Sequence, residues 1–194
     1  MSDTNSIFSC IYQSDNAKKL YHLIMANGGD PNILGKSRIT PLYVAVKNER
    51  INCVEMLINT FKANVNLSPK YKSGVTLLHI AVYNENLEII KMLIDAGVDI
   101  NARNSEGQTA LFSACIDRNL DIIKMLLDAG VDINATDSEG QTALVRACIE
   151  HKDYLKDLKE VKFEWELERV QNSVDRSQKC IDMLVIAMAK TLST

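Results

Sequence analysis

One segment of the chain occurs twice, in nearly identical sequence, at an interval of 33 residues. Residues 97–102 read Gly-Val-Asp-Ile-Asn-Ala and return at 130–135, and residues 105–111 (Ser-Glu-Gly-Gln-Thr-Ala-Leu) return at 138–144. Between the copies lie two short helical patterns, each of which is apolar on one face. Helices this short are marginal in isolation, so each pair has to bury its apolar face against a neighbouring copy. The sequence therefore predicts a stack of repeated helix pairs.

The same unit can be followed along most of the chain. Residues 76–81 read Thr-Leu-Leu-His-Ile-Ala, which is close to the Thr-Pro-Leu-His-x-Ala signature of ankyrin repeats, and residues 86–101 are similar to the second helix and exit of that repeat. The chain thus resembles an ankyrin-repeat protein, most closely over residues 7–144. This resemblance implies an all-α solenoid of about five helix-turn-helix repeats with hairpin loops, forming a single domain over residues 1–194.

The resemblance divides the chain into five repeats. The first has lost the signature of its first helix and is expected to be the N-terminal cap, because one face of a terminal repeat meets water. The second opens at Thr40, and the next helix start at Thr76 comes 36 residues later instead of 33, so a protruding loop is predicted between them. The approximate repeat boundaries are 3–34, 35–70, 71–103, 104–136 and 137–194.

The fifth repeat contains the largest departure from the period. Residues 180–185 match the second helix at 122–127 only after an insertion of 25 residues. The inserted segment, residues 151–176, has no glycine or proline, is rich in charged residues and places apolar residues at helical spacing. It is predicted to extend the first helix or to add another, with Trp165 packing partly against the last repeat.

Composition bears on location and on the class of partner. The net charge of −3 and the 24% of charged residues give no global attraction to nucleic acid or to a membrane surface. The first residues show no basic region followed by an apolar run, and no stretch reaches the ~18 apolar residues of a membrane span. A cytoplasmic or nuclear location is expected.

The five cysteines, among them Cys53, Cys115, Cys148 and Cys180 at aligned helix positions, are expected to be small, buried, reduced residues.

Motifs for catalysis and cofactor binding are incomplete. Residues 29–37 resemble a phosphate-binding loop, but five residues instead of four precede the Gly-Lys-Ser and one of them is Pro31. Residues 132–137 begin like a calcium loop, yet Asp137 stands where that loop needs glycine. The spacings of the three histidines fit no zinc pattern. The sequence therefore predicts no catalytic residues, no cofactor and no metal, and a protein that is not an enzyme.

The resemblance also implies where a partner would bind. Ankyrin-repeat proteins use their hairpin tips and the concave face of their first helices, and these positions can be carried over repeat by repeat. With the aromatic residue of the insertion added, the candidate partner-binding residues are Lys36, Arg38, Lys47, Lys70, Lys72, Tyr83, Arg103, Glu106, Phe112, Asp117, Glu139, Glu150 and Trp165. Most of the cations belong to early repeats and the anions to later ones, so a partner segment with polarised charge is expected. A solvated surface residue is the alternative for any single charge.

These observations favour a non-enzymatic protein–protein interaction module, which could be an adaptor, a scaffold or an inhibitor. It is expected to act as a monomer on a protein partner, without nucleic acid and without a membrane. Two alternatives stay open: a host-directed effector of a virus or intracellular pathogen that binds in the same way, and a structural subunit that oligomerises through the C-terminal insertion. A nucleotide- or metal-dependent enzyme is a further class, which the incomplete motifs disfavour.

Overall fold

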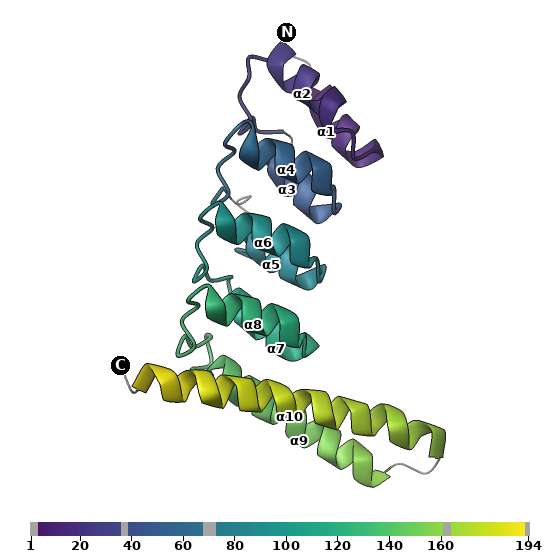
Figure 1. Cartoon of the computed structure of the whole chain (residues 1–194), viewed down its shortest axis with the longest axis vertical. Coiled ribbons are helices and arrows are strands. Elements are labelled where there is room, and N and C mark those ends of the chain that lie inside the picture. The colour runs from purple at the N-terminus through teal and green to yellow at the C-terminus, as the bar shows by residue number, and fades with distance from the viewer. Residues whose placement is uncertain (1–3, 36–38, 68–72, 161–163, 193–194) are drawn as a thin grey trace. The chain divides into compact units, whose positions relative to one another are not determined.

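The computed structural model describes residues 4–35, 39–67, 73–160 and 164–192. In these ranges the chain forms ten helices and no strand, and an isolated antiparallel bridge joins Thr136 to Thr142. Figure 1 shows that consecutive helices lie side by side in pairs. The predicted all-α architecture of five helix pairs is thereby confirmed. The chain divides into two compact units, unit one (residues 1–105) and unit two (residues 106–194), which are described separately.

Unit one contains three helix pairs. They are α1 (Thr4–Gln13) with α2 (Ala17–Ala26), α3 (Pro41–Lys47) with α4 (Ile51–Asn59), and α5 (Leu77–Tyr83) with α6 (Leu87–Asp95). First helices pack on first helices, in the order α1, α3, α5, and second helices pack on second helices, in the order α2, α4, α6. The result is a two-layer arrangement in which each pair buries its apolar faces against its neighbours.

Unit two contains the last two pairs. They are α7 (Ala110–Asp117) with α8 (Leu120–Asp128), and α9 (Ala143–Glu160) with α10 (Glu164–Leu192). Here α7 packs on α9 in the layer of first helices, and α8 packs on α10 in the layer of second helices. The same two-layer rule therefore holds in this unit.

Threonine side chains start the first helices of two interior repeats. The hydroxyl of Thr40 accepts a hydrogen bond from the backbone N–H of Tyr43 at 3.1 Å. Thr76 forms a capping box with His79, in which the threonine hydroxyl lies 2.8 Å from the imidazole Nδ1. These contacts satisfy N–H groups that have no partner within the helix, which is why a threonine at this position marks a helix start.

Left-handed residues make the turn from first to second helix. Glu49, Glu85 and Arg118 have φ values of 54°, 55° and 54° at equivalent positions. Asn86 and Asn119 follow directly and accept a hydrogen bond from the third residue of their helix, at 3.1 and 3.2 Å. The sharp turn and the asparagine cap together fix the angle between the two helices of each pair.

Helix α4 is capped by the preceding helix pair. Its own N-cap residue, Arg50, makes no side-chain capping bond. Instead, the Asp15 carboxylate accepts from the backbone N–H groups of Asn52 and Cys53 at 3.0 and 2.9 Å, and from the Asn52 amide at 2.8 Å. Although burial raises the pKa of Asp15, these hydrogen bonds outweigh it, and the pKa lies below its ordinary value.

The core repeats along the chain with the helix pairs. Leu57, Leu93, Leu126 and Leu184 occupy the same position in successive second helices, and each has an exposed fraction of 0%. The burial of Leu184 agrees with an alignment that places residues 180–185 after a 25-residue insertion.

The insertion lengthens both helices of the last pair. Helix α9 has 18 residues and α10 has 29, against 8 and 9 in α7 and α8. The predicted helical character of residues 151–176 is confirmed for 151–160 and 164–176. The side chain of Trp165 lies outside the described residues, so its predicted packing stays a prediction.

The sequence predicts that all five cysteines are buried, but the structure shows that one is exposed. Cys10, Cys53, Cys115 and Cys180 are buried free thiols, whereas Cys148 is exposed. The prediction was wrong for Cys148 because α9 is the last of the first helices. In the described part of the chain, no helix pair follows α9 and α10 to cover this thiol.

Candidate functional site

In unit one, two of the predicted partner-binding residues lie next to each other. Lys47 ends α3 and Tyr83 ends α5, at equivalent positions of adjacent first helices. Both are exposed, and Tyr83 has the largest exposed fraction of the described large apolar side chains, 79%. The C-cap residue Asn84 holds them in register, because its amide donates to the carbonyl oxygens of Val46 and Lys47 at 3.4 Å.

The other candidates of unit one belong to loops. Arg103 is exposed on the hairpin that follows α6. Four further predicted residues lie outside the described residues, and they are Lys36, Arg38, Lys70 and Lys72.

Asparagine side chains join successive hairpins of unit one. The Asn66 side chain accepts from the backbone N–H of Asp99 at 2.8 Å and donates to the carbonyl oxygen of Gly97 at 3.2 Å. The Asn32 side chain likewise accepts from the N–H of Asn64 at 2.9 Å. These residues fix the spacing between hairpins, which presents the neighbouring tip residues in a defined arrangement.

In unit two, two hairpin acids are exposed on ordered turns. The carbonyl oxygen of Glu106 accepts from Ser138 N–H at 2.8 Å, which ties one hairpin to the next. The Asp137 carboxylate accepts from the N–H groups of Glu139 and Gln141, each at 2.9 Å. Glu106 and Glu139 are both exposed. Their backbone groups are held by hydrogen bonds, Glu106 to Ser138 and Glu139 to the Asp137 carboxylate.

The remaining candidates of unit two differ in accessibility. Asp117 is exposed at the end of α7. Glu150 is half-buried on α9 and lies 3.7 Å from the Arg146 guanidinium.

Phe112 was predicted to contact a partner, and the structure shows that this is wrong. Its side chain is buried, with an exposed fraction of 1%. Phe112 occupies the position that His79 holds in the preceding repeat, where the side chain turns inward toward the threonine that starts the helix. The phenyl ring cannot complete a capping box, and the Thr109 hydroxyl is buried without a hydrogen-bond partner among the described residues.

A histidine and a serine meet between α9 and α10. The imidazole Nδ1 of His151 lies 2.6 Å from the Ser177 hydroxyl oxygen, and that hydroxyl donates to the carbonyl oxygen of Val174 at 2.8 Å. The serine proton is therefore engaged, and the histidine N–H donates to the serine. Since Ser177 is only 2% exposed, the pair joins two helices and is not suited to nucleophilic catalysis.

Burial and neighbouring groups shift the pKa values of three buried thiols. Burial and then the neighbouring Asp15 carboxylate raise the pKa of Cys53 to about 12. In unit two, a hydrogen bond from Cys115 lowers the pKa of Cys180, with Arg118 adding to the effect, while the pKa of Cys115 is raised. Burial keeps both sulfurs from solvent, which makes a packing role the simplest interpretation.

The described residues contain neither a candidate metal-binding cluster nor a membrane-spanning helix. Within the described ranges, no group of three or more histidine, cysteine, aspartate or glutamate side chains could hold a metal ion. The described helices also include none that is long and apolar enough to cross a bilayer.

Two features missed by the sequence analysis are a structural aspartate and a groove. Asp15 caps a helix of the next repeat, and only its polar character was visible in the sequence. The groove lies between α8 and α10, has a volume of about 570 Å³ and is lined by Leu127, Met183 and Ile186 among others. Its one sequence signal is an isoleucine at position 186, where the aligned residue of α8 is Asp128.

Comparison with known families agrees with this architecture. Residues 7–104 and 96–165 match the model of ankyrin repeats (3 copies), so the matched span covers well over half of the 194 residues. No curated protein matches the chain significantly. The paired helices, the threonine caps of the first helices and the matched span lead to one conclusion: the chain belongs to the ankyrin-repeat family.

Proposed function

We propose that this protein is a non-enzymatic interaction module that binds a segment of a partner protein through its first helices and hairpin tips. Ankyrin repeats are protein–protein interaction modules in general, and the finer assignment rests on the surfaces described above. Adaptor, scaffold and inhibitor are the roles that such binding would serve. We place the protein in the cytoplasm or nucleus, acting as a monomer.

The observation that carries the proposal is the exposure of Tyr83. An aromatic side chain that is 79% exposed gains nothing from the core and presents a large apolar ring with a polar hydroxyl. Residues of this kind supply much of the binding free energy in protein interfaces. Asn84 fixes the helix end that carries Tyr83 against the end of α3, so the backbone position from which the ring extends is set before any partner arrives.

Charge adds a preference to this surface. In unit one the exposed Lys47 lies at the position equivalent to Tyr83 on the adjacent first helix, while unit two exposes Glu106, Asp117 and Glu139. A partner segment would therefore place an acidic group near Lys47 and basic groups near the acids of unit two. Such pairs raise the association rate more than the affinity, and salt weakens their effect.

Affinity capture with three versions of the protein tests the proposal. Wild type, Tyr83→Ala and Lys91→Ala would each be used as bait, with captured proteins quantified by mass spectrometry. Lys91 is exposed on the second helix α6, so its substitution controls for an unspecific change of surface. Tyr83→Ala should reduce capture of the specific partner by about 30-fold, the effect of losing about 2 kcal/mol at an interface hot spot. Equal recovery by all three baits would contradict the proposal.

A further inference from the structure

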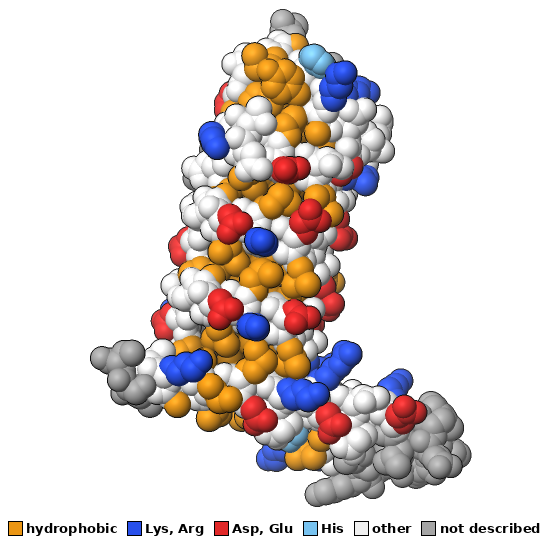
Figure 2. All heavy atoms as spheres, viewed as in Figure 1, with side chains coloured by type: hydrophobic (Ala, Val, Ile, Leu, Met, Phe, Trp, Pro, Cys, Tyr) orange, Lys and Arg blue, Asp and Glu red, His pale blue; other side chains and the backbone are white. Residues whose placement is uncertain are grey.

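The groove between α8 and α10 of unit two has an apolar lining. Leu127, Val131 and Ile133 line it from α8 and the hairpin that follows, and Met183 and Ile186 line it from α10. Its volume of about 570 Å³ is within the range of pockets that hold ligands or large side chains. Figure 2 shows apolar side chains exposed in the strip between these two helices.

The corresponding groove of unit one is more polar. It lies between α4 and α6, has a volume of about 400 Å³, and is lined by Asn59, Lys62 and Asp95 as well as by apolar residues. Alignment of the second helices places Ile186 where α4, α6 and α8 carry Asn59, Asp95 and Asp128. Ile186 is 57% exposed, so an apolar side chain has replaced a polar one at a site that water reaches. Val131 and Ile133 of the lining belong to the buried core, whereas Ile186 is exposed and has no core role. Exposed apolar surface beside a groove is typical of a binding site.

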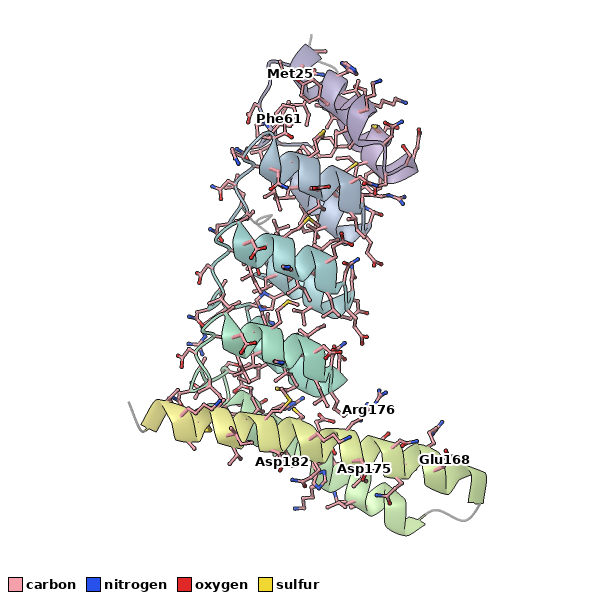
Figure 3. The ribbon with its side chains drawn as sticks, viewed as in Figure 1. Met25, Phe61, Glu168, Asp175, Arg176 and Asp182 are labelled. Carbon is pink, nitrogen blue, oxygen red and sulfur yellow. The ribbon has the colours of Figure 1, made fainter. Side chains whose placement is uncertain are left out.

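An aromatic contact joins the first two second helices of unit one, α2 and α4. The ring of Phe61, which follows α4, lies against the ring of Tyr21 on α2, with centroids 5.4 Å apart. Figure 3 labels Phe61 near the end of α4. An aromatic ring that follows one second helix thus packs on a ring of the preceding second helix. No equivalent ring from the described residues lines the groove between α8 and α10.

The rim of the groove between α8 and α10 carries more positive than negative charge. Lys124 of α8 and Lys190 of α10 are both lining residues, and Asp128 is the one acidic residue among them in the described part of the chain. Helix α10 continues to Leu192, beyond the point where the other second helices end at Asn59, Asp95 and Asp128. This extra length carries Lys190 to the end of the groove.

We infer that the groove between α8 and α10 binds a protein segment that inserts an aromatic or large aliphatic side chain and places a carboxylate near Lys124 and Lys190. The apolar lining and the exposed Ile186 define the anchor, and the two lysines define the charge beside it. The contact of Phe61 with Tyr21 shows that a large ring can pack beside second helices of this chain. This surface belongs to the second helices, so it is distinct from the first-helix and hairpin surface proposed above and adds a second contact region to the protein.

A library of random 16-residue peptides displayed on phage provides the probe. Selection on the immobilised wild-type protein should enrich peptides with an aromatic or large aliphatic residue close to an acidic one. The affinity of a synthetic copy of the enriched peptide is then measured by fluorescence anisotropy. Ile186→Asp, which introduces the residue that α6 and α8 carry at this position, should weaken binding at least tenfold. Lys124→Glu should also weaken peptide binding, and the loss should grow as the salt concentration is lowered. The glutamate repels the peptide carboxylate that the lysine attracts, and salt screens this repulsion.

Val185→Asp is the matched control. Val185 neighbours Ile186 on α10 and is 49% exposed, but it is not among the lining residues. This variant should bind the peptide within twofold of wild type, and all variants should retain the wild-type melting temperature. Tyr83→Ala should also bind normally, so loss of the first-helix surface and loss of the groove are told apart.

Three results would overturn the inference. One is the absence of enriched peptides, and another is an enriched peptide whose affinity is the same for Ile186→Asp and Val185→Asp. The third comes from sedimentation: if the wild type is a dimer that Ile186→Asp dissociates, the groove is occupied by a second copy of this chain instead of a different partner.

Discussion

Thr76 and Thr109 occupy the same position in successive repeats but meet different neighbours. The Thr76 hydroxyl lies 2.8 Å from His79 Nδ1, whereas the Thr109 hydroxyl is buried and has no hydrogen-bond partner among the described residues. Thr76→Val should therefore lower the free energy of unfolding by about 1 kcal/mol, the usual effect of losing a helix cap. Thr109→Val should leave it unchanged or raise it, because an unsatisfied buried hydroxyl is removed. Urea unfolding of both variants measures the difference, and equal losses would contradict this interpretation.

At the scale of the helix, α4 depends on a cap from another helix pair. Asp15→Asn should lower the free energy of unfolding at pH 7 by about 1 kcal/mol, because the carboxylate that accepts from Asn52 and Cys53 is lost. The folded pKa of Asp15 is lowered, so its contribution is present above the unfolded pKa of about 3.9 and is lost as pH falls through the folded pKa. The gap between wild type and variant should therefore close below about pH 4.

Urea unfolding at several pH values checks this prediction. Asp182→Asn is a suitable control, since Asp182 is exposed on α10 and accepts only from the side chain of Gln178 in the hydrogen bonds described. A constant gap from pH 7 to pH 3 would show that the charge of Asp15 is not what caps α4.

The lengthened α9 and α10 also make a prediction at this scale. Residues 151–176 include His151, whose hydrogen bond to Ser177 joins the two helices, and Val174, which is 8% exposed. Removing these residues should lower the melting temperature, because the bond is lost and a buried apolar contact is exposed to water. Circular dichroism during heating measures the change. Unchanged melting, together with fast amide exchange throughout the segment, would instead indicate a mobile charged arm.

For the molecule as a whole, the proposed charge complementarity can be tested with the partner recovered by affinity capture. Lys70→Glu with Lys72→Glu changes a loop of an early repeat, and Glu106→Lys with Glu139→Lys changes the hairpin tips of unit two. Each double variant should slow association at low salt, because it places like charges opposite the partner. Glu106 and Glu139 are exposed, so their substitution should leave stability unaffected. Wild-type association rates for both would remove the hairpin tips from the binding surface.

Much of this architecture follows from the sequence, because the features that specify it are local and repeat. A period of 33 residues, threonine and asparagine caps and apolar positions such as Leu93 and Leu126 act within one helix pair or its neighbour. The helical character of the insertion could be predicted for the same reason, since it depends on residue type and spacing. Exposure of Tyr83 and of the hairpin acids likewise followed from their places in the repeat.

Other properties depended on which surfaces meet, and only the tertiary structure decided them. Phe112 is buried because its helix position turns inward, and Cys148 is exposed because α9 is the last first helix. Asp15 reaches a helix start 37 residues away in sequence, which no local pattern reveals. The groove beside Ile186 exists because α8 and α10 are neighbours despite the inserted residues between them. Short-range periodicity thus determined the helices and their pairing, whereas burial at the last repeat and contacts between distant residues required the packed chain.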